Sequence, residues 1–163
     1  MFSIFFIFKV KDSKMKIDGI DKKIIRNLVK DARTPVLSIA REVGISGAAI
    51  HQRLRKLEKS KLIAGYHMKI NQSSIGYTTT AFVGIHLEPT AVLSSIIKRL
   101  KEIPEVVESH YTTGNYSIFV KVLNKNNQDL MRVLETKIQQ INGVSKIETF
   151  VSLQQQIDRQ IYI

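Results

Sequence analysis

The spacing of apolar residues changes along the chain, and this change constrains the fold more strongly than any other feature. As far as Leu57, apolar residues recur at every third or fourth position, which is the spacing of one face of a helix. After residue 78, the pattern runs strand, helix, strand, and this unit is then repeated. The sequence therefore predicts an α+β protein with a helical N-terminal domain and a ferredoxin-like C-terminal domain of order β-α-β-β-α-β.

Three helices are predicted in the N-terminal domain. The first is expected to begin after Asp18, its N-cap, and to end near Asp31. The second should have Thr34 as its cap and Pro35 in its first turn. Gly44 should end it, because glycine readily adopts the left-handed conformation that a tight turn requires. Two helices joined by such a turn are typical of a helix-turn-helix, whose second helix enters the DNA major groove.

The helix after the turn has an apolar side and a polar side. Ser46 should cap it, and Ile50, Leu54 and Leu57 recur at helical spacing and should be buried. On the polar side, glutamine can bridge N6 and N7 of adenine, and arginine can bridge O6 and N7 of guanine. We expect contacts with DNA from Ser46, Gly47, Ala48, His51, Gln52, Arg53, Arg55 and Lys56.

Basic residues are concentrated in the first half of the chain. Residues 1–70 contain 16 Lys and Arg against 6 Asp and Glu, whereas residues 71–163 contain 9 against 8. The excess predicts that the first half binds a polyanion such as double-stranded DNA, although a solvated face on an ordinary helical bundle is the alternative. Arg55 is the better candidate for base contacts, whereas Arg53 borders the apolar side and is expected to pair with Glu42 or Glu58, or to contact a phosphate.

The segments between the two patterns set the expected domain boundaries. Residues 62–70 alternate and predict a strand, which would make a winged helix-turn-helix or a connecting strand. Residues 71–77, NQSSIGY, are rich in turn-forming residues and indicate a linker. The expected boundaries are 1–14 for a leader, 15–62 for the helix-turn-helix domain, 63–77 for the connecting strand and linker, and 78–163 for the ferredoxin-like domain.

The leader begins with the apolar stretch MFSIFFIF. Its eight residues are fewer than the ~20 that a membrane-spanning helix needs. A charged region before it and a small-residue cleavage site after it are both missing, which argues against a secretory signal. We expect residues 1–14 to be disordered or an upstream-start extension, and we expect no membrane partner.

Several functional classes lack support in the sequence. The chain has no cysteine, which suits a reducing cytoplasm, and its four histidines do not have metal-ligand spacing. A nucleophile–base pair and a phosphate-binding loop are not recognisable either. We therefore expect no metal, no cofactor and no enzymatic activity, and a cytoplasmic location.

Two features of the C-terminal domain suggest surfaces for partners. Phe82, Phe119 and Phe150 should lie on the sheet face that the two helices leave uncovered, so we expect a second subunit to cover it. Between the central strands lies TTGNYS, Thr112–Ser117, where Gly114 permits a tight turn whose N–H groups can converge on a carboxylate. The alternative is an ordinary hairpin turn.

From Ile17 to Ile163 the sequence resembles the Lrp/AsnC family, the leucine-responsive or feast/famine transcription regulators. The matching stretches, in an order and spacing that agree across both halves, are IDKKI, IAREVGIS, RLRKLE, LIAGY, INQSSIGY, IPEVVE and GNYS. The resemblance implies a DNA-binding domain followed by a ferredoxin-like regulatory domain. It also implies dimers formed by back-to-back sheets, and octamers or larger assemblies.

The resemblance further implies that an amino acid binds between dimers, near the GNYS turn. The residues that it assigns to the effector site are Gly114, Asn115, Tyr116 and Ser117 in the turn, with Thr149 and Ser152 on the last strand. Ser117 departs from the family pattern, which has an aspartate there. The chain therefore lacks a carboxylate that could influence the effector response.

These observations favour a sequence-specific DNA-binding transcription regulator that responds to an amino acid. An alternative is a sequence-indifferent, DNA-compacting oligomer, which a basic half would also permit. An enzyme or an RNA-binding sheet on the same plan lacks the necessary motifs.

Overall fold

A computed structural model describes residues 16–161 and residue 163 of the chain. It divides into two compact units, which we describe separately: one holds the residues up to Met68 together with Arg159–Ile163, and the other is Lys69–Asp158. The expected leader lies outside the described residues. In the described part of the chain, no helix has the length and apolar character that crossing a membrane requires.

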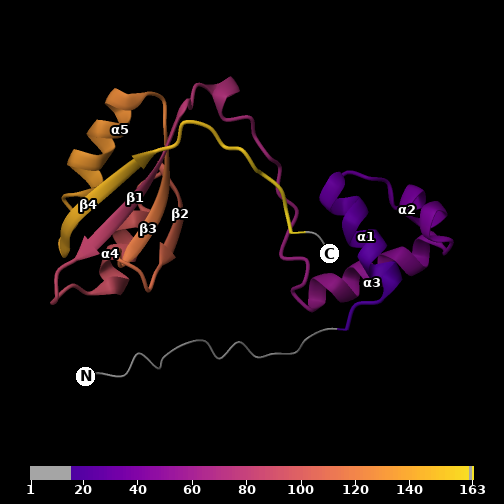
Figure 1. Cartoon of the computed structure of the whole chain (residues 1–163). Helices are drawn as coiled ribbons and strands as arrows, with labels where there is room; N and C mark the ends of the chain where they lie inside the picture. Colours follow the sequence, from indigo (N-terminus) through magenta and orange to yellow (C-terminus); the bar gives the residue numbers. More distant parts are fainter. Residues whose placement is uncertain (1–15, 162) are drawn as a thin grey trace. The chain divides into compact units, whose positions relative to one another are not determined.

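The first unit is built on three helices, as the sequence predicts (Figure 1). Their apolar faces meet in a small core in which Ile24, Ile39 and Ile50 are fully buried and Ala40 is nearly so. Each helix is amphipathic and too short to be stable alone, so the shared core holds the three together. The helices are α1 (Gly19–Lys30), α2 (Val36–Val43) and α3 (Gly47–Lys59).

The signals that begin and end these helices are mostly those expected. Asp18 caps α1, and Ser46 caps α3 by accepting a hydrogen bond of 3.2 Å from the backbone N–H of Ala49. Gly44 ends α2 in the left-handed conformation, with φ 78°, and its N–H donates to the carbonyl of Ala40. These local features produce the helix-turn-helix.

Thr34 was wrongly expected to cap α2. Its hydroxyl donates to the carbonyl of Asp31, at 2.7 Å, and so closes the turn after α1. Pro35 occupies the N-cap position, and its carbonyl accepts from the N–H groups of Ser38 and Ile39. The first turn of α2 therefore has no side-chain cap.

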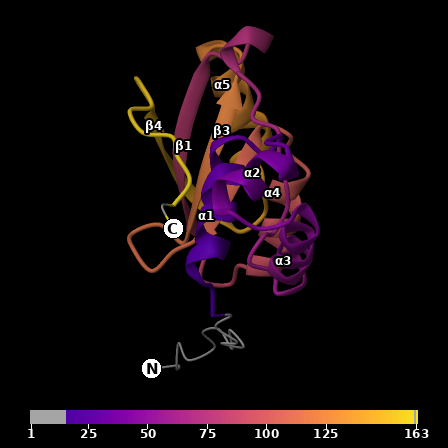
Figure 2. The same cartoon turned by 90° about the vertical axis from the view of Figure 1, so that its right-hand side faces the viewer.

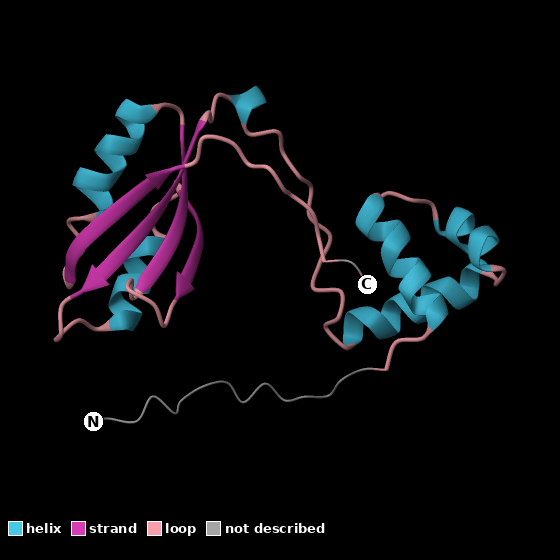
Figure 3. Ribbon diagram, in the orientation of Figure 1, coloured by secondary structure: helices cyan, strands magenta, loops and turns pink. Residues whose placement is uncertain are grey.

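The strand expected over residues 62–70 is not formed. These residues are a loop (Figure 3), followed by a short 3₁₀ turn, η1 (Ser73–Ile75), so the described part of this unit has no wing. Alternation alone does not make a strand, because a strand also needs a hydrogen-bonded neighbour. The apolar side chains of the segment are correspondingly exposed: Leu62, Tyr66, Met68 and Ile70.

The second unit has the predicted ferredoxin-like topology. Its four-stranded sheet has the order β2-β3-β1-β4, and every neighbouring pair is antiparallel. The elements are β1 (Thr79–Leu87), α4 (Leu93–Lys101), β2 (Val106–Tyr111), β3 (Ile118–Asn124), α5 (Asn127–Val133) and β4 (Val144–Val151). Helix α5 continues as a π-helical turn, η2 (Leu134–Ile138), which places Ile138 in the core five positions after Val133.

Both helices cover one face of the sheet (Figures 1 and 2). Alternate residues of β1 and β3 point into the core between the sheet and the helices, as strand geometry requires. The fully buried members from the two central strands are Ala81, Val83, Ile85, Ile118, Val120 and Val122, and those from the helical side are Ile96, Val133 and Ile138. Within this unit, residues 69–158, no helix or strand covers the other face of the sheet.

Replacing Gly44 by alanine should destabilise the first unit. An L-residue held in the left-handed region costs about 1–2 kcal/mol, so the free energy of unfolding should fall by that amount in chemical denaturation followed by helical circular dichroism. Gly19→Ala is the matched control, because Gly19 lies at the start of α1 with ordinary φ and open space around a β-carbon. Equal losses in the two variants would contradict this account of the turn.

Candidate DNA-binding surface and effector turn

One side of α3 is buried in the unit and the other side is exposed. Ile50 and Leu57 are fully buried, and Leu54 packs against the cluster that contains Ile50. The residues predicted to contact DNA mostly lie on the free side, where Ser46, Ala48, His51, Gln52, Arg55 and Lys56 are all exposed. The alternation of burial every three or four positions thus separates the packing side from the side that can approach a partner.

The first residues of α3, Gly47 and Ala48, have small side chains or none. A β-carbon at Gly47 would lie 3.3 Å from Cδ2 of Leu37 in α2, so glycine allows the two helices to cross closely. Leu37 is itself 65% exposed, and Ala48 adds only a methyl group to the first turn of α3. The first turn of α3 therefore has no large side chain of its own at Gly47 or Ala48, and the exposed Leu37 of α2 lies next to it.

Arg53 differs from the other predicted contacts, because it is engaged within the unit. Its Nη1 donates to Oδ2 of Asp18 and to Oδ1 of Asp21, at 2.7 Å each. The expectation that Arg53 pairs with Glu42 or Glu58 was wrong. Glu58 instead accepts a 3.0 Å hydrogen bond from the hydroxyl of Tyr66.

The spacing of Asp18 and Asp21 in the sequence is a signal for this pairing. Asp18 and Asp21, three residues apart, form a capping box in which each side chain bonds the backbone N–H of the other. Such a box presents two carboxylates at one helix start, where a guanidinium can bridge them. The hydrogen bond from the Asp21 N–H, followed by that from Arg53, lowers the pKa of Asp18 below its ordinary value.

The turn that joins β2 to β3 is more open than expected. Gly114 is not in the left-handed region, and a β-carbon there would meet nothing within 4 Å. The N–H groups of Thr112 and Ser117 already donate, to the carbonyls of Ser117 and Ile85 respectively, at 3.0 Å. The turn therefore does not use the left-handed conformation that glycine permits, and Gly114 lies in open space.

Tyr116 leaves the turn and lies over the uncovered face of the sheet. Its ring covers Gly84, where a β-carbon would lie 2.4 Å from Cδ1 of the tyrosine. The ring packs against Phe119 and Phe150, with centroids 5.8 and 6.2 Å away, and Phe119 stacks on Phe82 at 5.9 Å. The three phenylalanines thus share the uncovered face, as predicted, and Tyr116 joins them.

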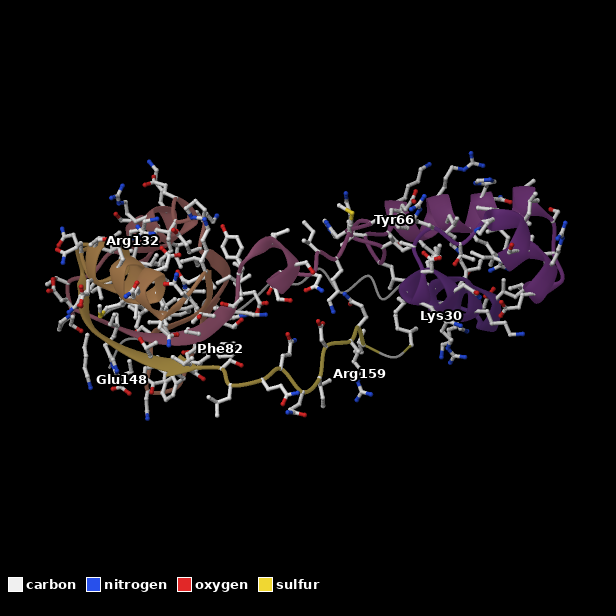
Figure 4. The ribbon with its side chains drawn as sticks, turned by 90° about the horizontal axis from the view of Figure 1, so that it is seen from above. Lys30, Tyr66, Phe82, Arg132, Glu148 and Arg159 are labelled. Atoms are coloured by element: carbon white, nitrogen blue, oxygen red, sulfur yellow. The ribbon has the colours of Figure 1, made fainter. Side chains whose placement is uncertain are left out.

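Glu148 holds the hydroxyl of Tyr116 on this face. Its Oε2 accepts from that hydroxyl at 2.9 Å, while its Oε1 accepts from Nζ of Lys146 at 2.7 Å and lies 3.5 Å from Nε2 of His86. Figure 4 shows Glu148 and Phe82 on the side of the unit away from Arg132 of α5. The hydrogen bond to Glu148 raises the pKa of Tyr116, because it stabilises the protonated phenol and the carboxylate repels the phenolate. Lys146, then Tyr116, lower the pKa of Glu148.

The two remaining predicted effector residues are not brought to the turn within one chain. Thr149 is paired in register with Val83, whereas its neighbour Glu148 is opposite Gly84. Since side chains alternate along a strand, Thr149 points to the opposite side from Glu148 and Tyr116. Ser152 lies beyond β4 and donates its N–H to the carbonyl of Thr80, at the far end of β1 from the turn.

Two cavities open on the helical side of the second unit. One, of about 250 Å³, lies between α4 and η2, and the other, of about 320 Å³, lies between α4 and β2. Neither is lined by a predicted effector residue. In the part of the chain that the structure describes, no group of three or more His, Cys, Asp and Glu side chains could hold a metal ion.

Comparison with known proteins identifies both units. Residues 17–58 match the AsnC-type helix-turn-helix domain, and residues 80–162 match the Lrp/AsnC ligand binding domain. Regulatory protein AsnC of Haemophilus influenzae is 43% identical over 89% of this chain and 97% of its own length. The HTH-type transcriptional regulator LrpA of Pyrococcus horikoshii is 35% identical over 80% of this chain and 92% of its own length.

Solved structures agree with the sequence matches. Escherichia coli AsnC superposes with a TM-score of 0.87 and 35% identity, covering 91% of this chain and all of that one. A feast or famine regulatory protein from Mycobacterium tuberculosis, complexed with L-methionine, has a TM-score of 0.83 and 27% identity, with coverage of 91% and 100%. The chain belongs to the Lrp/AsnC family, and it is a transcription regulator with a helix-turn-helix DNA-binding domain.

Position 84 should tolerate only glycine, because the ring of Tyr116 leaves no room for a β-carbon there. Gly84→Ala creates an overpacked contact, which typically costs about 1–3 kcal/mol, so unfolding of the second unit should occur at lower denaturant concentration. In a Tyr116→Ala background the same substitution should cost little, because the clashing ring is gone. An additive double variant would show that the ring does not occupy this position.

Proposed function

We propose that the protein is a non-enzymatic, sequence-specific transcription regulator that reads DNA with α3 and responds to an amino acid bound at the turn over residues 112–117. The observation that carries the DNA part is the free face of α3, which exposes Gln52 and Arg55 while Ile50 and Leu57 are fully buried. The proposed site of action is the cytoplasm, where a regulator of this class meets DNA.

In the proposed complex, the exposed face of α3 enters the major groove. Gln52 and Arg55 can form bidentate hydrogen bonds with adenine and guanine. Gly47 and Ala48 permit close approach at the first turn, and Ser46, His51 and Lys56 contact the backbone or the groove edge. A protein that only compacts DNA needs basic charge but not these two bidentate groups, so the composition of the face favours sequence recognition.

A second copy of the chain is proposed to cover the open face of the sheet. Phe82, Phe119, Phe150 and Tyr116 form a contiguous aromatic surface there, and Phe150 is 49% exposed. A two-fold dimer through this face would present two copies of α3 to DNA, with half-sites about one helical turn (~10 bp) or a multiple apart. Larger assemblies, such as octamers, would join such dimers.

The effector is proposed to contact the turn at Gly114 and Asn115. The strongest support is Gly114, since neither its backbone conformation nor a neighbouring side chain requires a glycine. Small size there is useful if a ligand or another subunit approaches closely. Asn115 is exposed beside it, and Tyr116 and Ser117 complete the turn. Thr149 and Ser152 would then contribute from a neighbouring subunit, and the methionine complex of the mycobacterial relative supports an amino acid as the ligand class.

Replacing Gln52 or Arg55 by alanine should change the DNA sequence that the protein selects. Each lost bidentate pair removes about 1–3 kcal/mol of discrimination at one base pair, which selection from random DNA would reveal as a relaxed position in the motif. Lys98→Ala is the control, because it removes one exposed positive charge from α4 in the other unit. An unchanged motif in both α3 variants would refute the groove assignment, and the lack of any motif in the wild type would favour compaction.

A selective amino acid should stabilise the protein against heat. A ligand at a hundred times its Kd adds about 2.7 kcal/mol, which corresponds to a rise in Tm of several degrees in a screen of the proteinogenic amino acids. Asn115→Ala should abolish the rise, whereas Asn142→Ala, in the exposed turn before β4, should retain it. If no amino acid stabilises the wild type, the effector part of the proposal is wrong.

A further inference from the structure

Arg53 joins the middle of α3 to the start of α1 through two carboxylates. The guanidinium Nη1 lies 2.7 Å from Oδ2 of Asp18 and 2.7 Å from Oδ1 of Asp21. The Asp21 side chain is only 5% exposed and that of Arg53 is 30% exposed, so solvent competes little for the inner bond. This is a directional contact in a unit whose other α3 contacts are mainly apolar.

The two carboxylates also accept hydrogen bonds from the backbone at the start of α1. Oδ1 of Asp18 accepts from the Asp21 N–H at 2.8 Å, and Oδ2 of Asp21 accepts from the Asp18 N–H at 3.2 Å. All four carboxylate oxygens are therefore used, one of each pair by the capping box and the other by Arg53. The start of α1 is a rigid receptor for the guanidinium.

This contact constrains the rotation of α3 about its own axis. The apolar packing of Ile50 and Leu54 is non-directional and tolerates small rotations, whereas two short hydrogen bonds do not. Side-chain tips of Gln52 and Arg55 lie at roughly 5–6 Å from the helix axis or beyond, so a rotation of roughly 10° moves them by about 1 Å. A displacement of that size is enough to break a bidentate contact with a base.

The same contact removes Arg53 from the set of free positive charges. Two carboxylates surround one guanidinium, and their hydrogen bonds raise the pKa of Arg53 further above its ordinary value. A charge compensated in this way adds little to the attraction of a phosphate. It differs in this respect from Arg55 and Lys56, which are exposed and for which no ion pair is found among the described residues.

We propose that Arg53 is a positioning residue for DNA recognition, which sets the rotation of α3 through Asp18 and Asp21 and does not contact phosphate. This inference rests on the proposed reading of DNA by α3. It assigns a role in specificity to the two acidic residues at the start of α1, Asp18 and Asp21, whose charge would otherwise be expected only to weaken DNA binding.

The salt dependence of binding distinguishes positioning from phosphate contact. The slope of log K against log salt counts the phosphates that a protein neutralises, and it falls by about one when a phosphate contact is removed. Arg53→Met, which keeps the aliphatic length, should leave this slope unchanged, and its loss of affinity for random DNA, which comes only from the uncompensated carboxylates, should be much smaller than its loss on the selected site. Its preference for the selected site over random DNA should fall by about ten- to a hundredfold, and Arg53→Lys should restore part of it.

Asp18→Asn removes a negative charge, whereas Arg53→Met removes a positive one. It is also less disruptive to folding, because the Asp18 side chain is 53% exposed. Loss of a negative charge alone should strengthen binding to all DNA, whereas loss of positioning should lower the preference for the selected site. We expect the preference to fall while affinity for random DNA stays equal or rises. Asp31→Asn, at the other end of α1 and exposed, is the matched control and should retain the preference.

Two results would overturn the proposal. A shallower salt slope with Arg53→Met, together with equal losses on selected and random DNA, would make Arg53 a phosphate contact. Unchanged preference in both Arg53→Met and Asp18→Asn would show that the ion pairs do not affect reading. If the wild type selects no DNA motif, the proposed sequence-specific function is refuted. That outcome is distinguishable from the two results above, which require a wild type that does select a motif.

Discussion

Ile50 of α3 packs in one core with Ile24 of α1 and Ile39 of α2, and all three side chains are fully buried. This contact turns three short helices into a unit, because none of them could be stable alone. It also determines which side of α3 remains free. Everything proposed about DNA recognition depends on that one-sided burial, since a helix packed on both sides would have no face to offer a groove.

The sheet of the second unit is likewise buried on one face only. The sheet buries the Ala81, Val83 and Ile85 side against two helices and leaves its aromatic side open. Tyr116 connects the two parts of the proposed regulatory mechanism. Its backbone belongs to the turn that contains Gly114, and its ring lies on the open face, where its hydroxyl donates to Glu148. In the proposed regulator, a ligand at the turn would therefore act on side chains that also meet the second subunit.

Local sequence signals predicted what depends on neighbours in the chain. The period of the apolar residues indicated the helices and the four strands of the ferredoxin-like sheet, and Asp18, Gly44 and Ser46 indicated helix ends. Such signals work because caps and turns are made by residues a few positions apart. The same reasoning failed for residues 62–70, where alternation was present but no hydrogen-bonded strand partner was.

Residue spacing and type along the chain are sufficient to predict the architecture, the family resemblance and the free face of α3. The partners of individual polar side chains, by contrast, follow from the way the elements pack. Arg53 bonds Asp18 and Asp21, which are more than thirty positions away, and Tyr116 reaches Glu148 across Gly84. Contacts between residues so distant in the chain depend on how the elements pack, and periodicity along one element contains no information about which distant group will lie within hydrogen-bonding distance.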